Sequence, residues 1–71
     1  MNHRRSGTVQ AVSEGRQEAI IRADEDGADI LAPYAELRDS DPEPSALRTG
    51  ERVTYMREEQ SRGPIARDIC R

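Results

Sequence analysis

Carboxylates form the densest group of chemically active side chains in this sequence, with four of them in the run DEDGAD at residues 24–29. A calcium-binding loop would need a glycine at position six and a glutamate at position twelve of such a run. Here the glycine is at position four, and Ala35 occupies position twelve. We therefore interpret residues 24–29 as a solvated turn and expect no metal site there.

Catalytic chemistry has few candidates, because His3 is the only histidine and Cys70 the only cysteine. The two lie at opposite ends of the chain, whereas nucleophilic catalysis needs a nucleophile and a base within hydrogen-bond reach. A single cysteine also cannot form an internal disulfide. We expect a protein that is not an enzyme and has no cofactor.

Arginine supplies every basic side chain except that of His3, with 11 arginines and no lysine. A guanidinium group forks onto phosphates and stacks on bases, which suits a nucleic-acid binder. A GC-rich coding sequence would give the same bias without any function. The formal net charge of −3 argues against a broad phosphate-binding surface.

The 71 residues allow one small domain, and 34% of them are hydrophobic, with no Phe or Trp. A chain of this size buries only about 60% of its unfolded surface, so the core must be thin. The apolar residues still occur in regular clusters, which favours an ordered domain over disorder. No apolar run is long enough to span a membrane, and the start of the chain is not a secretory signal, so we expect a cytoplasmic monomer.

The apolar clusters predict five short strands, at residues 7–12, 17–23, 28–32, 52–57 and 65–69. Gly15 and Gly27 mark the turns between the first three strands: Gly15 is free to take a positive φ, and Asp-Gly before an apolar run is typical of a hairpin. A helix over residues 14–25 is the main alternative, but these two glycines limit it to a marginal length. Turn signals at this spacing predict a small barrel.

Residues 1–5 read as a flexible lead-in, residues 6–70 as one domain, and residues 38–50 as a long polar loop. Pro33 should end the third strand, and residues 34–37 could form one helical turn. Ile21, Ile30 and Val53 should meet in one interior. Tyr55 alternates with Val53 along the fourth strand and is also assigned to the core.

The order of these anchors resembles the bacterial cold-shock domain over residues 7–69. The matching motifs are G-x-V from Gly7, the apolar pair Ile20-Ile21, Y-A-E-L from Tyr34, L-x-x-G-E-x-V-x-Y from Leu47 and R-G-P-x-A from Arg62. The resemblance implies an all-β, five-stranded antiparallel OB-fold barrel. It also implies binding of single-stranded RNA or DNA through the first three strands.

This sequence departs from the family on that binding face. The family's tryptophan corresponds to Ala11, and the two phenylalanines of its first motif correspond to Glu18 and Ile20. In the second motif, phenylalanine becomes Leu31 and histidine becomes Pro33. Each base stacked on an aromatic ring contributes about 1–3 kcal/mol, so the resemblance implies weak binding here.

The resemblance gives six candidate nucleic-acid-binding residues: Gln10, Arg16, Ile20, Leu31, Tyr34 and Arg62. Two functions remain open. The first is weak binding of single-stranded RNA or DNA in the regulation of gene expression. The alternative is a protein-interaction module that regulates the transcription or translation machinery, with nucleic-acid binding lost and an apolar patch at Ile20 and Leu31 as its contact surface.

Overall fold

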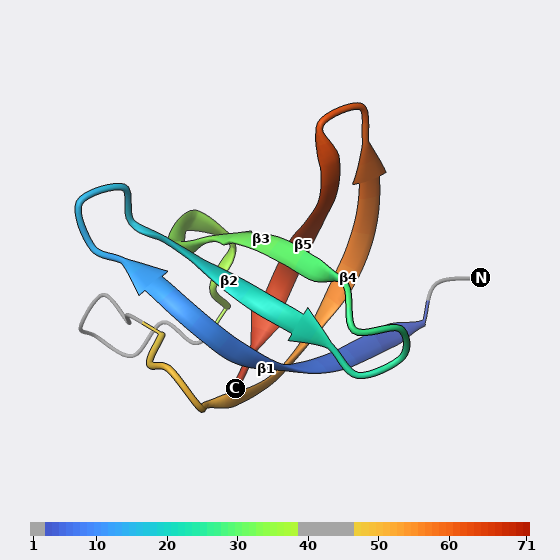
Figure 1. The fold of residues 1–71 in the computed structure, drawn as a ribbon, viewed down its shortest axis with the longest axis horizontal. Coiled ribbons are helices and arrows are strands. Elements are labelled where there is room, and N and C mark those ends of the chain that lie inside the picture. The colour runs from blue at the N-terminus through green and yellow to red at the C-terminus, as the bar shows by residue number, and fades with distance from the viewer. Residues whose placement is uncertain (1–2, 39–46) are drawn as a thin grey trace.

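A computed structural model, which describes residues 3–38 and 47–71, shows a closed five-stranded barrel (Figure 1). This confirms the predicted all-β class. The elements in chain order are β1 (Arg4–Ser13), β2 (Glu18–Ala23), β3 (Asp29–Pro33), the 3-10 turn η1 (Tyr34–Glu36), β4 (Arg52–Gln60) and β5 (Gly63–Cys70). In the part of the chain described, no helix is long and apolar enough to cross a membrane.

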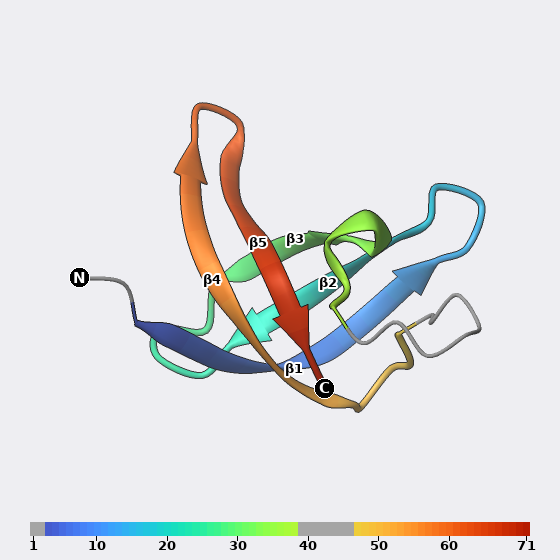
Figure 2. The ribbon, with the colours of Figure 1, turned by 180° about the vertical axis from the view of Figure 1, so that it is seen from behind.

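The barrel closes in the order β1-β2-β3-β5-β4, and β4 returns to pair with β1. All contacts are antiparallel except that between β3 and β5, which are parallel at Leu31 and Ile65. Seen from behind, β4 and β5 cross in front of β2 and β3 (Figure 2). The ten-residue β1 pairs with strands on both of its sides: its Gly7 pairs with Ala23 on β2 and with Val53 on β4.

Gly7 permits this close passage of β1 past β2. A Cβ atom at this position would lie 2.5 Å from the carbonyl oxygen of Arg22 and 2.6 Å from Cγ2 of Ile21. The first of these atoms belongs to the backbone and cannot rotate away. Position 7 therefore requires glycine for packing, although its φ is not left-handed.

The inward-facing residues form one thin aliphatic core that confirms the predicted meeting of Ile21, Ile30 and Val53. The buried hydrophobic residues are Val9, Ala19, Ile21, Ala23, Ile30, Ala32, Leu47, Val53, Tyr55, Ala66 and Ile69. Four of these are alanines, and Tyr55 is the largest fully buried side chain. The tyrosine ring therefore fills volume that a phenylalanine or tryptophan often fills in other cores.

Several strand boundaries differ from the predicted ones. β1 begins at Arg4, because Arg4 and Arg5 pair with Met56 and Tyr55 on β4. β4 extends to Gln60, because its last residues pair with the start of β5. Polar residues adopt strand when a tertiary partner is present, which local propensity does not register. Residues 1–2, in the predicted lead-in, and residues 39–46, in the predicted loop, lie outside the described residues.

The first turn was predicted to place its positive φ at Gly15, and this is wrong. Gln17 adopts the left-handed conformation, with a φ of 55°, and this brings Glu18 into register with Ser13. Gly27, in the second predicted turn, takes a positive φ of 73°. Residues 18–23 are strand, so the helix alternative over residues 14–25 is also wrong.

Candidate nucleic-acid interface

The outer face of the barrel carries a row of apolar side chains that crosses four strands. Ile20 on β2 pairs with Ala11 on β1 and with Leu31 on β3, and Leu31 pairs with Ile65 on β5. Ala11 is exposed, and the other three are half-buried, while their chain neighbours on β2 and β3 point into the core. We call Ala11, Ile20, Leu31 and Ile65 the aliphatic strip.

Ile65 is the strip residue that sequence reasoning missed. It lies on the last strand, and the parallel contact with Leu31 depends on how the barrel closes. One signal was present in the sequence. Ile65 precedes Ala66, and Ala66 is buried, so alternation along β5 sends Ile65 to the outer face.

Gln10 lies at the β1 end of the strip, in a β-bulge. Val9 pairs with Ile21 and Ala11 pairs with Ile20, which leaves Gln10 as the extra, exposed residue. The Val9 carbonyl accepts a hydrogen bond of 2.8 Å from the Gly50 backbone N–H. A bulge bends its strand and redirects a side chain, and here it keeps Gln10 on the surface beside the strip.

Tyr34 begins η1 and is half-buried against the core, whereas the sequence grouped it with Ile20 and Leu31. Its backbone N–H donates to the Gln17 carbonyl at 2.9 Å, and its ring packs against the core. Burial raises the pKa of its hydroxyl, and the Glu14 carboxylate adds to this rise. A tyrosine whose hydroxyl is buried offers little free ring for stacking on a base.

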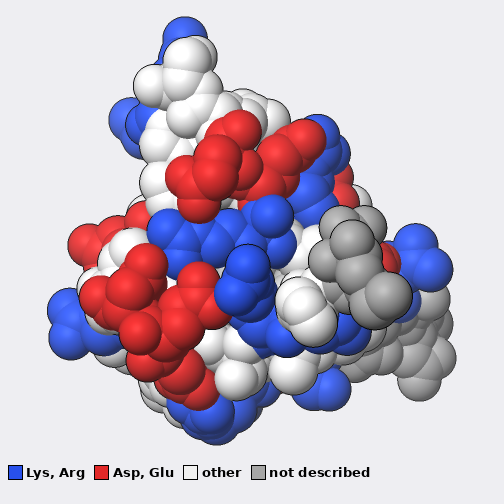
Figure 3. Space-filling model, turned by 90° about the vertical axis from the view of Figure 1, so that its right-hand side faces the viewer, with Lys and Arg blue, Asp and Glu red and all other residues white. Residues whose placement is uncertain are grey.

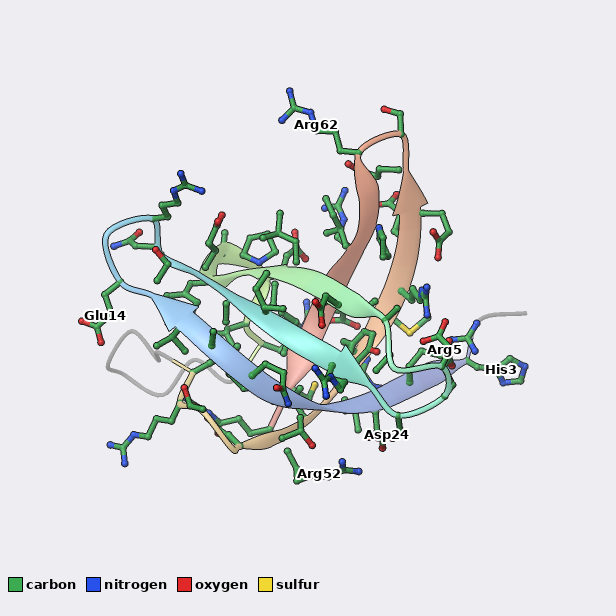
Figure 4. All side chains as sticks on the ribbon, viewed as in Figure 1. His3, Arg5, Glu14, Asp24, Arg52 and Arg62 are labelled. Atoms are coloured by element: carbon green, nitrogen blue, oxygen red, sulfur yellow. The ribbon has the colours of Figure 1, made fainter. Side chains whose placement is uncertain are left out.

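Arg16 and Arg62 occupy the two hairpin turns that lead into strip strands. Arg16 precedes β2, is exposed, and has its Nη1 atom 3.8 Å from Oε2 of Glu18. Arg62 precedes β5 and points away from the barrel at the tip of the β4–β5 hairpin (Figure 4). Both predicted basic residues are therefore exposed at turns next to strands that carry the strip.

Most of the other arginines are engaged by carboxylates. Seven of them make ion pairs of 3.2 Å or less with acidic side chains: Arg4, Arg5, Arg38, Arg52, Arg57, Arg67 and Arg71. Figure 3 shows acidic and basic side chains interleaved on the face that lies to the right in Figure 1. That face presents little uncompensated positive charge to a phosphate backbone.

Arg22 is a second residue that the sequence reasoning missed. It is exposed on β2, two positions after Ile20 and therefore on the same face, opposite Thr8 and Asp29. Within residues 3–38 and 47–71, its guanidinium has no ion pair. Arg22 therefore adds a positive charge beside the strip, and Arg16 and Arg62 add two more at the turns before β2 and β5.

Acidic side chains of the run at residues 24–29 form ion pairs with arginines of β4. Asp24 accepts hydrogen bonds of 2.7 and 2.9 Å from the Arg52 guanidinium, which holds the pKa of Asp24 below its ordinary value. Arg57 reaches Glu25 at 2.9 Å and Asp26 at 3.1 Å. The carboxylates of the β2–β3 turn therefore bind this turn to β4 through ion pairs.

Comparison with known proteins adds evidence on the fold. No protein-family model matches the chain, and no curated protein matches it. The chain is similar to a solved structure described as drosophila Unr CSD456, with a TM-score of 0.77 and 20% sequence identity over 96% of this chain. The similarity covers 26% of that other chain, so this protein spans about a quarter of its length. The chain is thus a five-stranded closed barrel similar to a cold-shock domain, of the OB-fold type.

Proposed function

We propose that this chain binds single-stranded RNA or DNA on the outer face of β1, β2, β3 and β5, and acts in this way in the regulation of gene expression. The observation that carries the proposal is the aliphatic strip, with Arg22 beside it on β2 and with Arg16 and Arg62 in the turns before β2 and β5. Fold similarity alone does not carry function, so the argument rests on these side chains.

The strip offers flat apolar contact to the faces of unpaired bases. In a duplex these faces are stacked on one another, whereas in a single strand they can lie against a protein surface. Three neighbouring strands place Ile20, Leu31 and Ile65 side by side, spaced by the separation of strands in a sheet. This arrangement favours single strands over duplexes.

Arg16, Arg22 and Arg62 supply the contacts to phosphate. Arg22 extends from β2 beside the strip, and Arg16 and Arg62 extend from the turns before β2 and β5. Guanidinium groups bind phosphate through paired N–H donors and can also stack on a base. Since no aromatic residue belongs to the strip, we expect binding to be weak compared with surfaces that stack bases on rings.

The test is a titration of unlabelled oligo-dT and oligo-U into isotopically labelled protein at low salt, followed by amide NMR shifts. The proposal expects shifts for Ile20, Leu31 and Ile65 and small shifts for Met56 and Arg57 on β4. No shift with either oligonucleotide would contradict the proposal. Shifts confined to the β2–β3 turn and β4 would show binding on another face and would also contradict it.

A further inference from the structure

Glu18 places a carboxylate directly beside the aliphatic strip. It pairs with Ser13 on β1 and with Pro33 on β3, and it lies two residues before Ile20 on the same face of β2. Its side chain is 27% exposed. A base that lies on Ile20 and Leu31 would therefore have one edge near this carboxylate.

The Glu18 oxygens have no hydrogen-bond donor among the described residues, and their one charged neighbour is Arg16 at 3.8 Å. Asp24 differs, because it accepts bonds from Arg52 and from the Ser6 hydroxyl at 3.1 Å. Glu18 therefore keeps its acceptor capacity for a ligand. The same negative charge repels any phosphate that passes close to it.

Building on the proposed function, we infer that Glu18 makes the face selective for guanine among unpaired bases. A carboxylate presents two acceptors side by side and binds best to a pair of parallel donors. Guanine has such a pair on its Watson–Crick edge, the ring N1–H and the exocyclic N2 amino group. Unpaired bases in single strands are commonly recognised at this edge.

The other bases fit the carboxylate less well. Cytosine and adenine each place one amino group beside a ring nitrogen that is itself an acceptor. Thymine and uracil place their single N–H between two carbonyl oxygens, which a carboxylate repels. Good bidentate contacts discriminate between bases, and at a partly exposed site we expect the lower end of their range, about a five- to tenfold preference for guanine.

The experiment measures binding of labelled thymidine strands by fluorescence anisotropy at low salt. One strand is all thymidine, a second carries one central guanosine, and a third carries inosine, which lacks the N2 amino group, at the same place. Wild-type protein should bind the guanosine strand about five- to tenfold more tightly than the all-thymidine strand. Inosine should lose most of this preference.

Glu18→Gln should remove the preference for guanosine and tighten binding of the all-thymidine strand, because it removes the repulsive charge. Glu14→Gln is the matched control, since Glu14 extends from the β1–β2 turn (Figure 4) and its removal changes the net charge equally. The control variant should keep the guanosine preference. A general effect of net charge would instead appear in both variants.

Equal binding of all three strands by the wild-type protein would overturn the guanine inference and leave the proposed function in place. A preference that survives Glu18→Gln would overturn the role of Glu18. Failure of every strand to bind would overturn the proposed function and the guanine inference with it.

Discussion

Single residues on the two faces of a strand have different roles in this barrel. Ile20, Leu31 and Ile65 lie on the outside and are half-buried, so changing them alters the surface more than the core. Tyr55 lies inside with no exposed area, and its hydroxyl has no hydrogen-bond partner among the described residues. Substitutions at these two kinds of position should separate binding from stability.

Leu31→Ser should weaken binding of single strands by several-fold, because it replaces the central apolar contact of the strip with a hydroxyl. The matched control is Met56→Ser, a change at a half-buried apolar side chain of β4 that is not part of the strip. Anisotropy titrations of both variants, with melting curves to verify folding, measure the difference. Equal losses in the two variants would contradict a binding role for the strip.

Tyr55→Phe should leave stability unchanged or raise it by up to about 1 kcal/mol. The substitution keeps the buried ring and removes a hydroxyl that is buried without a partner, and leaving such a group unpaired costs free energy. Burial raises the pKa of this hydroxyl, and Glu25 adds to the rise. Urea unfolding measures the change; a clear loss of stability would show that the hydroxyl has a partner, such as a buried water.

At the scale of elements, the β2–β3 turn is held to β4 by arginines of unequal burial. The Arg57 side chain is 13% exposed and reaches Glu25, Asp26 and Glu59, whereas that of Arg52 is 61% exposed and reaches Asp24. Exposed ion pairs contribute little to stability. Removing one partner of a mostly buried ion pair lowers stability more, because the charge that remains has no partner. The two arginines should therefore differ in importance.

Arg57→Gln should lower the free energy of unfolding by about 1–3 kcal/mol, because three carboxylates lose a charged hydrogen-bond donor. Arg52→Gln should lower it by less than about 1 kcal/mol. Denaturant unfolding of both variants measures the two changes. If Arg52→Gln lowers the free energy of unfolding more than Arg57→Gln does, the ion pairs of Arg57 are not the main contacts that hold this turn to β4.

For the whole molecule, the important property is how its charge is distributed. Among the described residues, seven arginines are neutralised by close carboxylates, whereas Arg16, Arg22 and Arg62, on or next to strands that carry the strip, have no partner within 3.2 Å. A thin core and a net charge of −3 accompany this arrangement. Both the salt dependence of binding and the acid stability should reflect it.

Salt should weaken binding only gradually. With Arg16, Arg22 and Arg62 as phosphate contacts, the logarithm of the binding constant should fall with the logarithm of salt concentration with a slope of about −2. Anisotropy titrations over a range of sodium chloride concentrations measure the slope. A much steeper slope would mean that paired arginines exchange their carboxylates for phosphates.

Acid should destabilise the barrel below about pH 4. The pKa of Asp24 is lowered by Arg52, that of Asp26 by the Ala28 backbone N–H and then Arg57, and that of Glu58 by Arg67 and Gln60. In the folded protein these three carboxyl groups have pKa values below their ordinary ones. Their contribution to stability is therefore fully present above the ordinary pKa values, and it is lost as the pH falls through the folded-state pKa values. Melting temperatures from pH 7 to pH 2 should stay level and then fall, less steeply at high salt.

The sequence alone determined much of the fold, because period-two alternation assigns each strand residue to a face wherever that face is buried. It identified five strands, the interior positions Ile21, Ile30 and Val53, the core tyrosine and the turn at Gly27. It also indicated the outward positions of Ile20 and Leu31. These features depend on local pattern, which a single chain shows directly.

Only the tertiary structure decided which residues meet across the barrel. The parallel contact of β3 and β5 added Ile65 to the strip, and η1 placed Tyr34 against the core. The pairing of arginines with distant carboxylates likewise left Arg22 available beside Ile20. The physical reason is that strand register and barrel closure arise from contacts between residues far apart in the chain, and local propensity contains no information on these contacts.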